Sequence, residues 1–303
     1  MSVKSVTAIL HGTTYNLVLN SSTGKYEATL TAPNESSYNN NVGHYFPVTI
    51  KATDDAGNVT TINDTDSTFG ENLKLKVKET VLPVIVISSP TDSEITSNAK
   101  PTVNWTVTDS GSGVNPDTIG ITIDEGNKII SGITKTQITN GYQCSYSVSE
   151  ALTDGTHTVC IDADDYDGNA ATTRTVSFLI DTIPPELSVI SPVNNLVTNS
   201  AQITLSGKTS DKTSGIDSVF YKINGGSSQN VDLDENGNFS TRIQLHAGAN
   251  TIVVTAVDEG GMSSSITRIV TLDISAPVIE NVSILPNPVS TGELIDISVT
   301  VTD

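Results

Sequence analysis

Apolar and polar residues alternate along short stretches of this chain, and turn residues separate the stretches. In Tyr142–Ser149, for example, Tyr142, Cys144, Tyr146 and Val148 share one face. This period of two is typical of half-buried β-strands. No window carries apolar residues at helical spacing over three turns, and Thr, Ser, Val, Ile and Asn dominate over good helix formers. The pattern therefore predicts an all-β protein.

Strands are expected at regular intervals in the middle of the chain. The first group comprises Val84–Ile87, Thr102–Thr108, Thr118–Asp124, Tyr142–Ser149, His157–Ala163 and Thr173–Ile180. The second comprises Leu187–Ile190, Gln202–Lys208, Ser218–Ile223, Gln229–Leu233, Asn238–Leu245, Thr251–Val257 and Ser265–Leu272. Short strands at this spacing with turn signals between them predict two-sheet antiparallel sandwiches.

One stretch of sequence occurs three times. DTIPPELSVISPVNNLVTNSAQITLSGKTSDKTSGI begins at Asp181, and it corresponds to ETVLPVIVISSPTDSEITSNAKPTVNWTVTDSGSGV, which begins at Glu79, 102 positions earlier. It also corresponds to DISAPVIENVSILPNPVSTGELIDISVTVTD, which begins at Asp273, 92 positions later. Each copy has proline at its fifth position: Pro83, Pro185 and Pro277. A period of about a hundred residues indicates an array of like domains in an elongated rod.

Four modules follow from the repeat. Residues 79–180 and 181–273 form complete modules, residues 1–78 form a module without its first two strands, and residues 274–303 supply the first two strands of a further module. Two explanations of the incomplete modules stay open. The chain is an excerpt of a longer array or begins with a smaller sandwich, or the last two strands complete the first module of another molecule, giving head-to-tail oligomers.

The acidic net charge of the chain disfavours some classes of binding partner. A formal net charge of −19 and a pI near 4.3 disfavour nucleic acid and anionic membrane surfaces, which both require clustered Lys and Arg. Cations, neutral glycans and other proteins are the expected partners. No apolar run approaches the roughly 20 residues that span a bilayer, and no signal peptide is visible at Met1, so membrane insertion is not expected.

The two cysteines, Cys144 and Cys160, lie in the same module. Strand phase places Cys144 on the buried face of its strand and Cys160 on the face opposite Val159 and Ile161. A disulfide would join an inward residue to an outward one. We therefore expect two free thiols.

Acidic residues recur at the same positions of each module. In a two-sheet sandwich, the turn after the second strand and the turn between the last two strands lie at the end where the linker enters. We therefore expect three acids to meet at each joint: Glu79, Asp109 and Asp165; Asp181, Asp211 and Asp258; and, if the ends complement each other, Asp273, Asp303 and Asp54. Oxygen-rich clusters of this kind suit Ca²⁺. The alternative is that these residues only bond their own turn backbone.

The other polar motifs indicate no catalytic chemistry. The segment DLDENGN from Asp232 lacks the last acidic ligand of an EF-hand, and the four histidines have no partner at metal-ligand spacing. No nucleophile elbow, P-loop, Rossmann or zinc motif occurs, so an enzyme is not expected. The segment YNNNVGHYF from Tyr38 to Phe46 is the candidate for binding a glycan through Tyr38, His44 and Tyr45. Alternatively, its aromatic residues cap the sandwich core.

Three stretches resemble a known family. VDLDENGNFSTRIQLHAGANTIVVTAVDEGG from Val231, KATDDAGNVT from Lys51 and the DTIPPELSVISP joint from Asp181 resemble bacterial immunoglobulin-like (Ig-like) repeat domains. The module 181–273 is similar to the accessory domain B of glucodextranase-type enzymes. The opening, SVKSVTAILHGTTYNLVLNSSTGKYEATLTAPN from Ser2, resembles Ig-like proteins encoded in phage regions of Firmicutes.

The resemblance implies tandem Ig-like sandwiches without catalytic activity. Such modules act as spacers in some proteins and as binding domains in others. The missing signal peptide and sortase anchor favour a structural or adhesive component of a phage tail or virion, which presents binding surfaces to proteins or glycans on a cell surface. The alternative is a fragment of a secreted bacterial adhesin, or the accessory region of a carbohydrate-active enzyme.

Overall fold

The computed structural model describes residues 2–303. Its regular structure is β-strand except for one short 3₁₀ helix, and the part of the chain described contains no α-helix. This confirms the predicted all-β class. The chain forms two compact units, Met1–Glu94 with Ala99–Leu179 and Ile95–Asn98 with Ile180–Asp303. Within residues 2–303, no helix is long and apolar enough to cross a membrane.

Residues 1–78 contain a single six-stranded sheet, in the order β3-β2-β1-β4-β5 with β6 paired to β4. Its strands are β1 (Val3–Leu10), β2 (Thr13–Asn20), β3 (Lys25–Glu27), β4 (Phe46–Asp54), β5 (Val59–Ile62) and β6 (Lys74–Leu75). His11 and Gly12 both have positive φ, 46° and 76°, as the two-residue turn between β1 and β2 requires. Leu73 ends the 3₁₀ helix η1 (Gly70–Leu73), which leads directly into β6, a strand of only two residues.

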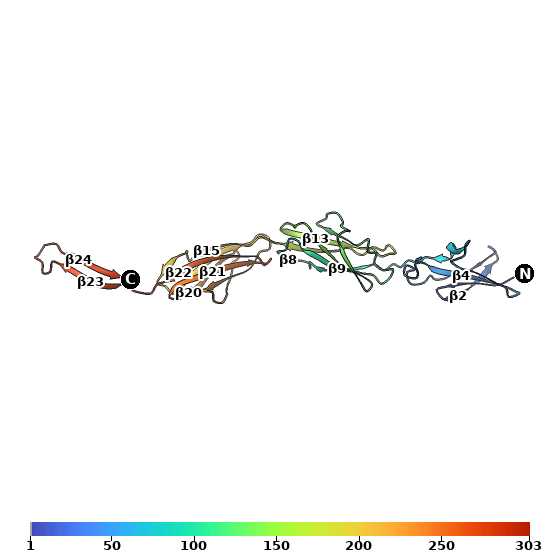
Figure 1. The fold of residues 1–303 in the computed structure, drawn as a ribbon, viewed down its shortest axis with the longest axis horizontal. Coiled ribbons are helices and arrows are strands. Elements are labelled where there is room, and N and C mark those ends of the chain that lie inside the picture. The colour runs from blue at the N-terminus through green and yellow to red at the C-terminus, as the bar shows by residue number, and fades with distance from the viewer. Residues whose placement is uncertain (1) are drawn as a thin grey trace. The chain divides into compact units, whose positions relative to one another are not determined.

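Residues 79–180 contain strands of two further sheets. One has the order β11-β12-β9-β7, and the other contains β10, β13 and β14 in that order (Figure 1). The strands are β7 (Val84–Ser89), β9 (Thr102–Thr108), β10 (Gly120–Ile123), β11 (Thr134–Ile138), β12 (Gly141–Ser147), β13 (Gly155–Asp162) and β14 (Arg174–Ile180). Alternate residues of these strands form a closed core: Val103, Trp105, Val107, Ile121, Val159, Ile161 and Phe178 are all buried. The short strand β8 (Ile95–Thr96) belongs to the second unit.

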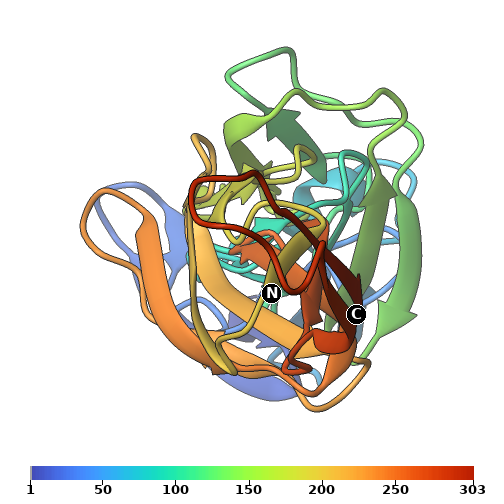
Figure 2. The same ribbon diagram turned by 90° about the vertical axis from the view of Figure 1, so that its left-hand side faces the viewer.

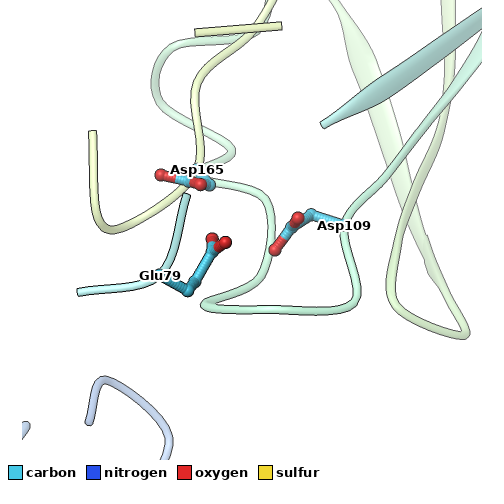
Figure 3. Close-up of side chains that lie close together, drawn as sticks. All are labelled: Glu79, Asp109 and Asp165. Atoms are coloured by element: carbon cyan, nitrogen blue, oxygen red, sulfur yellow. The ribbon is translucent and has the colours of Figure 1, made fainter. Parts of the chain in front are cut away.

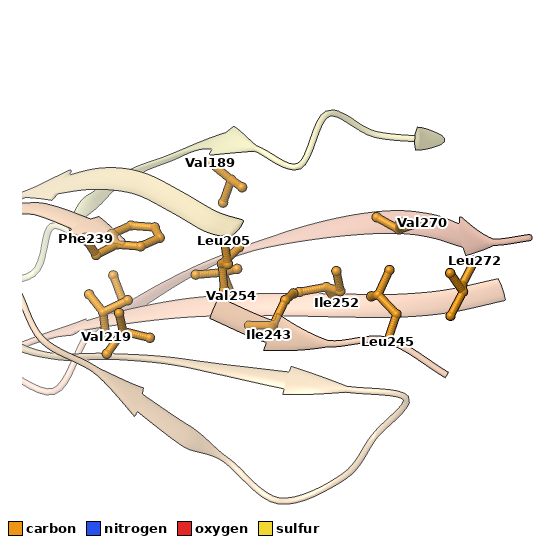
Figure 4. Close-up of a cluster of buried hydrophobic side chains, with 12 residues drawn as sticks. Val189, Leu205, Val219, Phe239, Ile243, Leu245, Ile252, Val254, Val270 and Leu272 are labelled. Atoms are coloured by element: carbon orange, nitrogen blue, oxygen red, sulfur yellow. The ribbon is translucent and has the colours of Figure 1, made fainter. Parts of the chain in front are cut away.

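Residues 181–273 repeat this plan. One sheet has the order β15-β17-β20 and the other β16-β22-β21-β18-β19. The strands are β15 (Glu186–Ser191), β16 (Leu196–Thr198), β17 (Gln202–Ser210), β18 (Ile216–Ile223), β19 (Gln229–Val231), β20 (Asn238–Gln244), β21 (Gly248–Asp258) and β22 (Ser263–Leu272). Figure 4 shows the core between the sheets, where Leu205, Ile252 and Val254 are fully buried. These paired sheets are the predicted tandem sandwiches.

The last two strands form a separate two-stranded hairpin. β23 (Val278–Leu285) and β24 (Asp296–Thr302) are antiparallel neighbours, drawn in red in Figures 1 and 2. Almost every residue of both strands is exposed. Ile297, for example, is 63% exposed, whereas Leu205, its counterpart 92 positions earlier, is 0% exposed.

Both cysteines are free thiols, as strand phase predicted. Cys144 is buried on β12, and Cys160 is only partly buried on β13 between the buried residues Val159 and Ile161. Burial raises the pKa of the Cys144 thiol to about 11, although the positive charge of Lys135 acts in the opposite direction.

Candidate functional site

The first acidic cluster consists of Glu79, Asp109 and Asp165. Glu79 precedes β7, Asp109 follows β9, and Asp165 lies in the turn between β13 and β14. One carboxylate oxygen from each lies within 4.8 Å of the others. Figure 3 shows the Glu79 carboxylate between the loops that carry the two aspartates. The three acids predicted to meet at this joint therefore do so.

Each aspartate of the first cluster also holds its own turn. Asp109 Oδ2 accepts the backbone N–H groups of Gly111 and Gly113, at 3.0 and 2.7 Å. Asp165 Oδ1 accepts the Asn169 N–H at 2.8 Å, and its Oδ2 accepts the Asn169 side-chain amide at 2.7 Å. These are Asx-type turn bonds, so the turn role suggested by the sequence is present in both residues.

Glu79 brings the linker into the cluster. Its Oε1 accepts a hydrogen bond from the Asn169 amide at 3.3 Å, and Gly111 lies so close that a Cβ there would be 2.5 Å from the Glu79 Cδ. Burial raises the pKa of Glu79, as do the neighbouring carboxylates of Asp165 and Asp109. Burial also acts to raise the pKa of Asp165, but its hydrogen bonds from Asn169, together with the contact to Glu79, outweigh burial and lower the pKa. The cluster therefore gathers three carboxyl groups, of which Asp109 and Asp165 are buried, and disfavours the charged form of Glu79.

The second cluster consists of Asp181, Asp211 and Asp258, again with one oxygen from each within 4.8 Å of the others. Asp181 precedes β15, Asp211 follows β17, and Asp258 ends β21. Asp211 Oδ1 accepts the N–H groups of residues 213–215 at 2.9 to 3.1 Å. Asp181 Oδ2 accepts the N–H of Ser214 at 3.1 Å and also its hydroxyl.

The carboxylates of the second cluster also affect one another's pKa values. Burial raises the pKa of Asp258, and the negative charges of Asp181 and Asp211 raise it further. For Asp211, the three backbone N–H donors outweigh burial and lower the pKa. Gly260 allows the close approach of the linker, because a Cβ there would lie 3.2 Å from the Asp181 carbonyl oxygen. Both clusters thus combine one linker acid, two turn acids and a closely packed glycine.

The third predicted group, Asp54, Asp273 and Asp303, is divided between the two compact units, so its meeting stays a prediction. Asp54 forms the same turn as Asp165: its two carboxylate oxygens accept the Asn58 N–H and side-chain amide, both at 2.8 Å.

In the candidate glycan-binding loop, the ring of Tyr38 already stacks on other aromatic rings. The Tyr38 ring is stacked between His44, with centroids 3.9 Å apart, and Tyr166, with centroids 4.1 Å apart. The Tyr45 hydroxyl donates to Asp64 Oδ2 at 2.8 Å. A sugar would have to displace one ring to stack on Tyr38, and glycan binding here stays a prediction. The sequence pattern did not single out Tyr166, which occupies the position of Asp55 in the first module.

Two other polar motifs have structural roles. His157 is buried, its Nδ1 lies 2.6 Å from Asp124 Oδ2 and its Nε2 lies 2.7 Å from the Thr153 carbonyl oxygen. Burial lowers the pKa of His157, but these two bonds outweigh it and raise the pKa overall. In the DLDENGN segment, Asp234 accepts the N–H and side-chain amide of Asn238, which closes the turn before β20.

Two family models match the chain, one on each complete module. Residues 79–182 match a bacterial Ig-like domain, and residues 185–274 match domain B of glucodextranase. The protein is built from tandem immunoglobulin-like domains. The chain is also similar to the fibronectin(III)-like modules of CbhA from Clostridium thermocellum, at 15% identity over 63% of this chain and 94% of that chain, with a TM-score of 0.38. Titin domains A168–A170 are similar at 13% identity over 76% of this chain and 74% of that chain, with a TM-score of 0.42. No curated protein matches the sequence.

The Ig-like plan explains why the acids meet. In this sandwich the loop after the second strand and the loop before the last strand emerge at the same end, which is also where the preceding linker enters. Asp109 and Asp165 occupy these loops in one module, and Asp211 and Asp258 occupy them in the next.

Proposed function

We propose that this chain is a non-enzymatic structural or adhesive protein whose Ig-like domains space or present binding surfaces within a phage tail or another virion-associated assembly. The observation that carries this is the repetition of one sandwich plan along the chain, in modules 79–180 and 181–273. Ig-like domains are typically non-catalytic, and bacterial ones are typically extracellular or surface-exposed.

The contacts at the first joint support a spacing role. Asn39 donates its side-chain amide to the carbonyl oxygens of Gly111 and Ser112, at 3.1 and 3.2 Å, and the Tyr38 ring stacks on Tyr166. Lys78 Nζ donates to the Asp167 carbonyl oxygen at 2.7 Å. These contacts restrain module 1–78 on module 79–180, as a spacer of defined geometry requires.

The net charge of −19 supports proteins or neutral glycans on a cell surface as partners, rather than nucleic acid. The resemblance of residues 2–34 to phage-encoded Ig-like proteins supports the virion as the location.

Immunogold labelling tests this location directly. Antibodies raised against the whole chain are applied both to phage particles released by the producing cells and to the intact cells. We expect label on the particles. Label confined to the surface of the intact cells would overturn the virion assignment and favour a secreted adhesin.

The alternative is an adhesin or an accessory region of a carbohydrate-active enzyme, and the match of residues 185–274 to glucodextranase domain B favours it. A hollow lined in part by Asn39, Asn140, Tyr142 and Tyr166 offers amides and aromatic rings to a glycan. A glycan array distinguishes the two functions. Binding that is lost in Tyr142→Ala and kept in Tyr221→Ala would support the alternative.

We expect copies of this chain to assemble head to tail. In this assembly the exposed hairpin β23–β24 of one copy binds to a second copy of the chain. β23 and β24 repeat the sequence of β15 and β17, and β17 pairs with β20, where Phe239 and Ile243 are buried. The segment GKYEATL from Gly24 corresponds to GNFSTRI from Gly237, so that Leu30 corresponds to Ile243; Leu30 is 37% exposed. Residues 24–30 therefore correspond to β20, and β24 corresponds to β17. We expect β24 of one copy to pair with residues 24–30 of another, as β17 pairs with β20.

Solution mass measured against concentration tests this assembly. We expect the mass of the full chain to rise with concentration, and Ile297→Asp to abolish the rise because it places a charge at the position of the buried Leu205. Val197→Asp, at an equally exposed residue of module 181–273, is the control and should assemble normally. A full chain that stays monomeric at every concentration would disprove self-assembly.

A further inference from the structure

One carboxylate oxygen in each acidic cluster is buried without a partner. Among the side chains described in residues 2–303, Asp109 Oδ1 and Asp258 Oδ2 have no hydrogen-bond donor. Asp109 is 5% exposed and Asp258 is 1% exposed. The other oxygen of each residue already accepts the backbone N–H groups of its turn. The turn hydrogen bonds therefore account for one oxygen of each carboxylate and do not account for the other.

Asp234 shows what a turn alone requires. It forms the same aspartate-to-asparagine turn, and both of its oxygens accept hydrogen bonds from Asn238 or the backbone. At Asp258 the corresponding position, four residues later, is Met262, which has no side-chain amide to donate. A buried carboxylate oxygen without a donor is costly, because the charge has lost its hydration and gained nothing in return.

The neighbouring carboxylates increase the free-energy cost of burying this unpartnered oxygen. Two further carboxylates lie beside each of these two aspartates, and none of the ion pairs described for residues 2–303 includes any of the six acids. An arrangement with three neighbouring carboxylates and no protein cation is stable only if protons or a cation neutralise it.

The donor set defines the class of cation. All six side chains offer carboxylate oxygens and none offers nitrogen or sulfur, which favours a hard cation over zinc or copper. Ca²⁺ binds oxygen at about 2.4 Å, so two ligands of one ion lie at most about 4.8 Å apart. The ligand atoms of each cluster meet this limit. Mg²⁺ fits less well, because it demands a near-ideal octahedron and retains its water.

We propose that each cluster is a Ca²⁺ site: Glu79, Asp109 and Asp165 bind one ion, and Asp181, Asp211 and Asp258 bind a second. In each site the ion ties the linker acid to two turns of the module that follows. The inference goes beyond the proposed function and does not depend on it, since a spacer with ion-free joints would still be a spacer.

Calorimetric titration of the full chain with Ca²⁺, after removal of metal with a chelator, counts the sites. We expect two ions per chain, with Kd of roughly 0.1–1 mM as in extracellular calcium modules. Asp109→Asn and Asp258→Asn are the test variants, because asparagine keeps an acceptor for the turn N–H groups and removes the charge. Each should bind one ion, and the double variant none. Asp234→Asn is the matched control and should bind two.

Thermal unfolding in Ca²⁺ and in chelator separates ion binding from loss of structure. A tenfold excess of Ca²⁺ over Kd should raise the melting temperature of each complete module by roughly 5–10 °C. In chelator, Asp109→Asn should melt at or above the temperature of the wild type, because it removes an uncompensated charge. In Ca²⁺ the order should reverse.

Three results would overturn the proposal. They are an unchanged melting temperature of the wild type in Ca²⁺, an equal response to Mg²⁺ at matched ionic strength, and loss of the Ca²⁺ response in Asp234→Asn to the same extent as in Asp109→Asn.

Discussion

Leu205→Ala removes a fully buried side chain from the core between β17 and the facing sheet of module 181–273. Leucine-to-alanine changes at such positions cost about 3–5 kcal/mol, from lost burial and from the cavity that remains. A domain of this size gains only about 5–15 kcal/mol from folding, so the change removes a large fraction of its stability. At roughly 4–8 °C per kcal/mol, we expect the module to melt at least about 12 °C lower.

The single tryptophan makes the assay selective. Trp105 is buried in the core of module 79–180, so its fluorescence reports the unfolding of that module alone, whereas calorimetry reports every module. If each sandwich is stabilised by its own core, Leu205→Ala should lower one calorimetric transition and leave the Trp105 transition unchanged.

Ile161→Ala is the matched variant, since Ile161 is fully buried in the core around Trp105. It should lower the Trp105 transition by an amount within the same range and leave the other module unaffected. If Leu205→Ala shifts the Trp105 transition as far as its own, the two modules unfold as one cooperative unit, and the view of the chain as an array of independently stable domains is refuted.

Three further predictions follow from single positions. Gly207→Ala should destabilise its module by about 1–3 kcal/mol in denaturant unfolding, because the new Cβ would lie 2.1 Å from a carbonyl oxygen of β15. At pH 8, iodoacetamide should modify Cys160 and spare Cys144, whose pKa near 11 leaves only about one thiolate in a thousand; equal labelling of the native protein would contradict this. Because the pKa of His157 is raised, its bond to Asp124 stabilises the fold below the usual histidine pKa of about 6.5, and this contribution is lost as pH rises through the folded value. The melting temperature of His157→Gln should therefore fall furthest below wild type in acid, and an unchanged difference at alkaline pH would contradict the assignment.

The alternation of apolar and polar residues was sufficient to predict those strands that have one buried face and one polar face. The strand Thr102–Thr108 was predicted with the bounds that β9 has, since Val103, Trp105 and Val107 alternate with polar residues. The strands β11 and β16 were missed. β11 is a polar edge strand without apolar alternation, and β16 has only three residues, so neither produces a periodic signal.

The meeting of the acids followed from topology, because three loops emerge at one end of an Ig-like sandwich. Other features depend on geometry that periodicity does not contain. The stack of Tyr38 on Tyr166 requires a particular rotation of one module on the next, and strand phase within either module does not set that rotation. Likewise, the unpartnered oxygen of Asp109 depends on which way its carboxylate turns once the Gly111 and Gly113 N–H groups have taken the other oxygen.

The linker acids determine what calcium would do for the chain. Asp109 and Asp165 belong to loops already fixed by their own turns, whereas Glu79 belongs to the connection that precedes β7. Binding an ion through all three carboxylates would therefore order the connection more than the sandwich. Glu79→Gln should leave the unfolding of module 79–180 in chelator nearly unchanged and abolish the protection that Ca²⁺ gives residues 79–83 against proteolysis. Equal protection of this segment in wild type and variant would mean that the joint is held by the Asn39 and Tyr38 contacts alone.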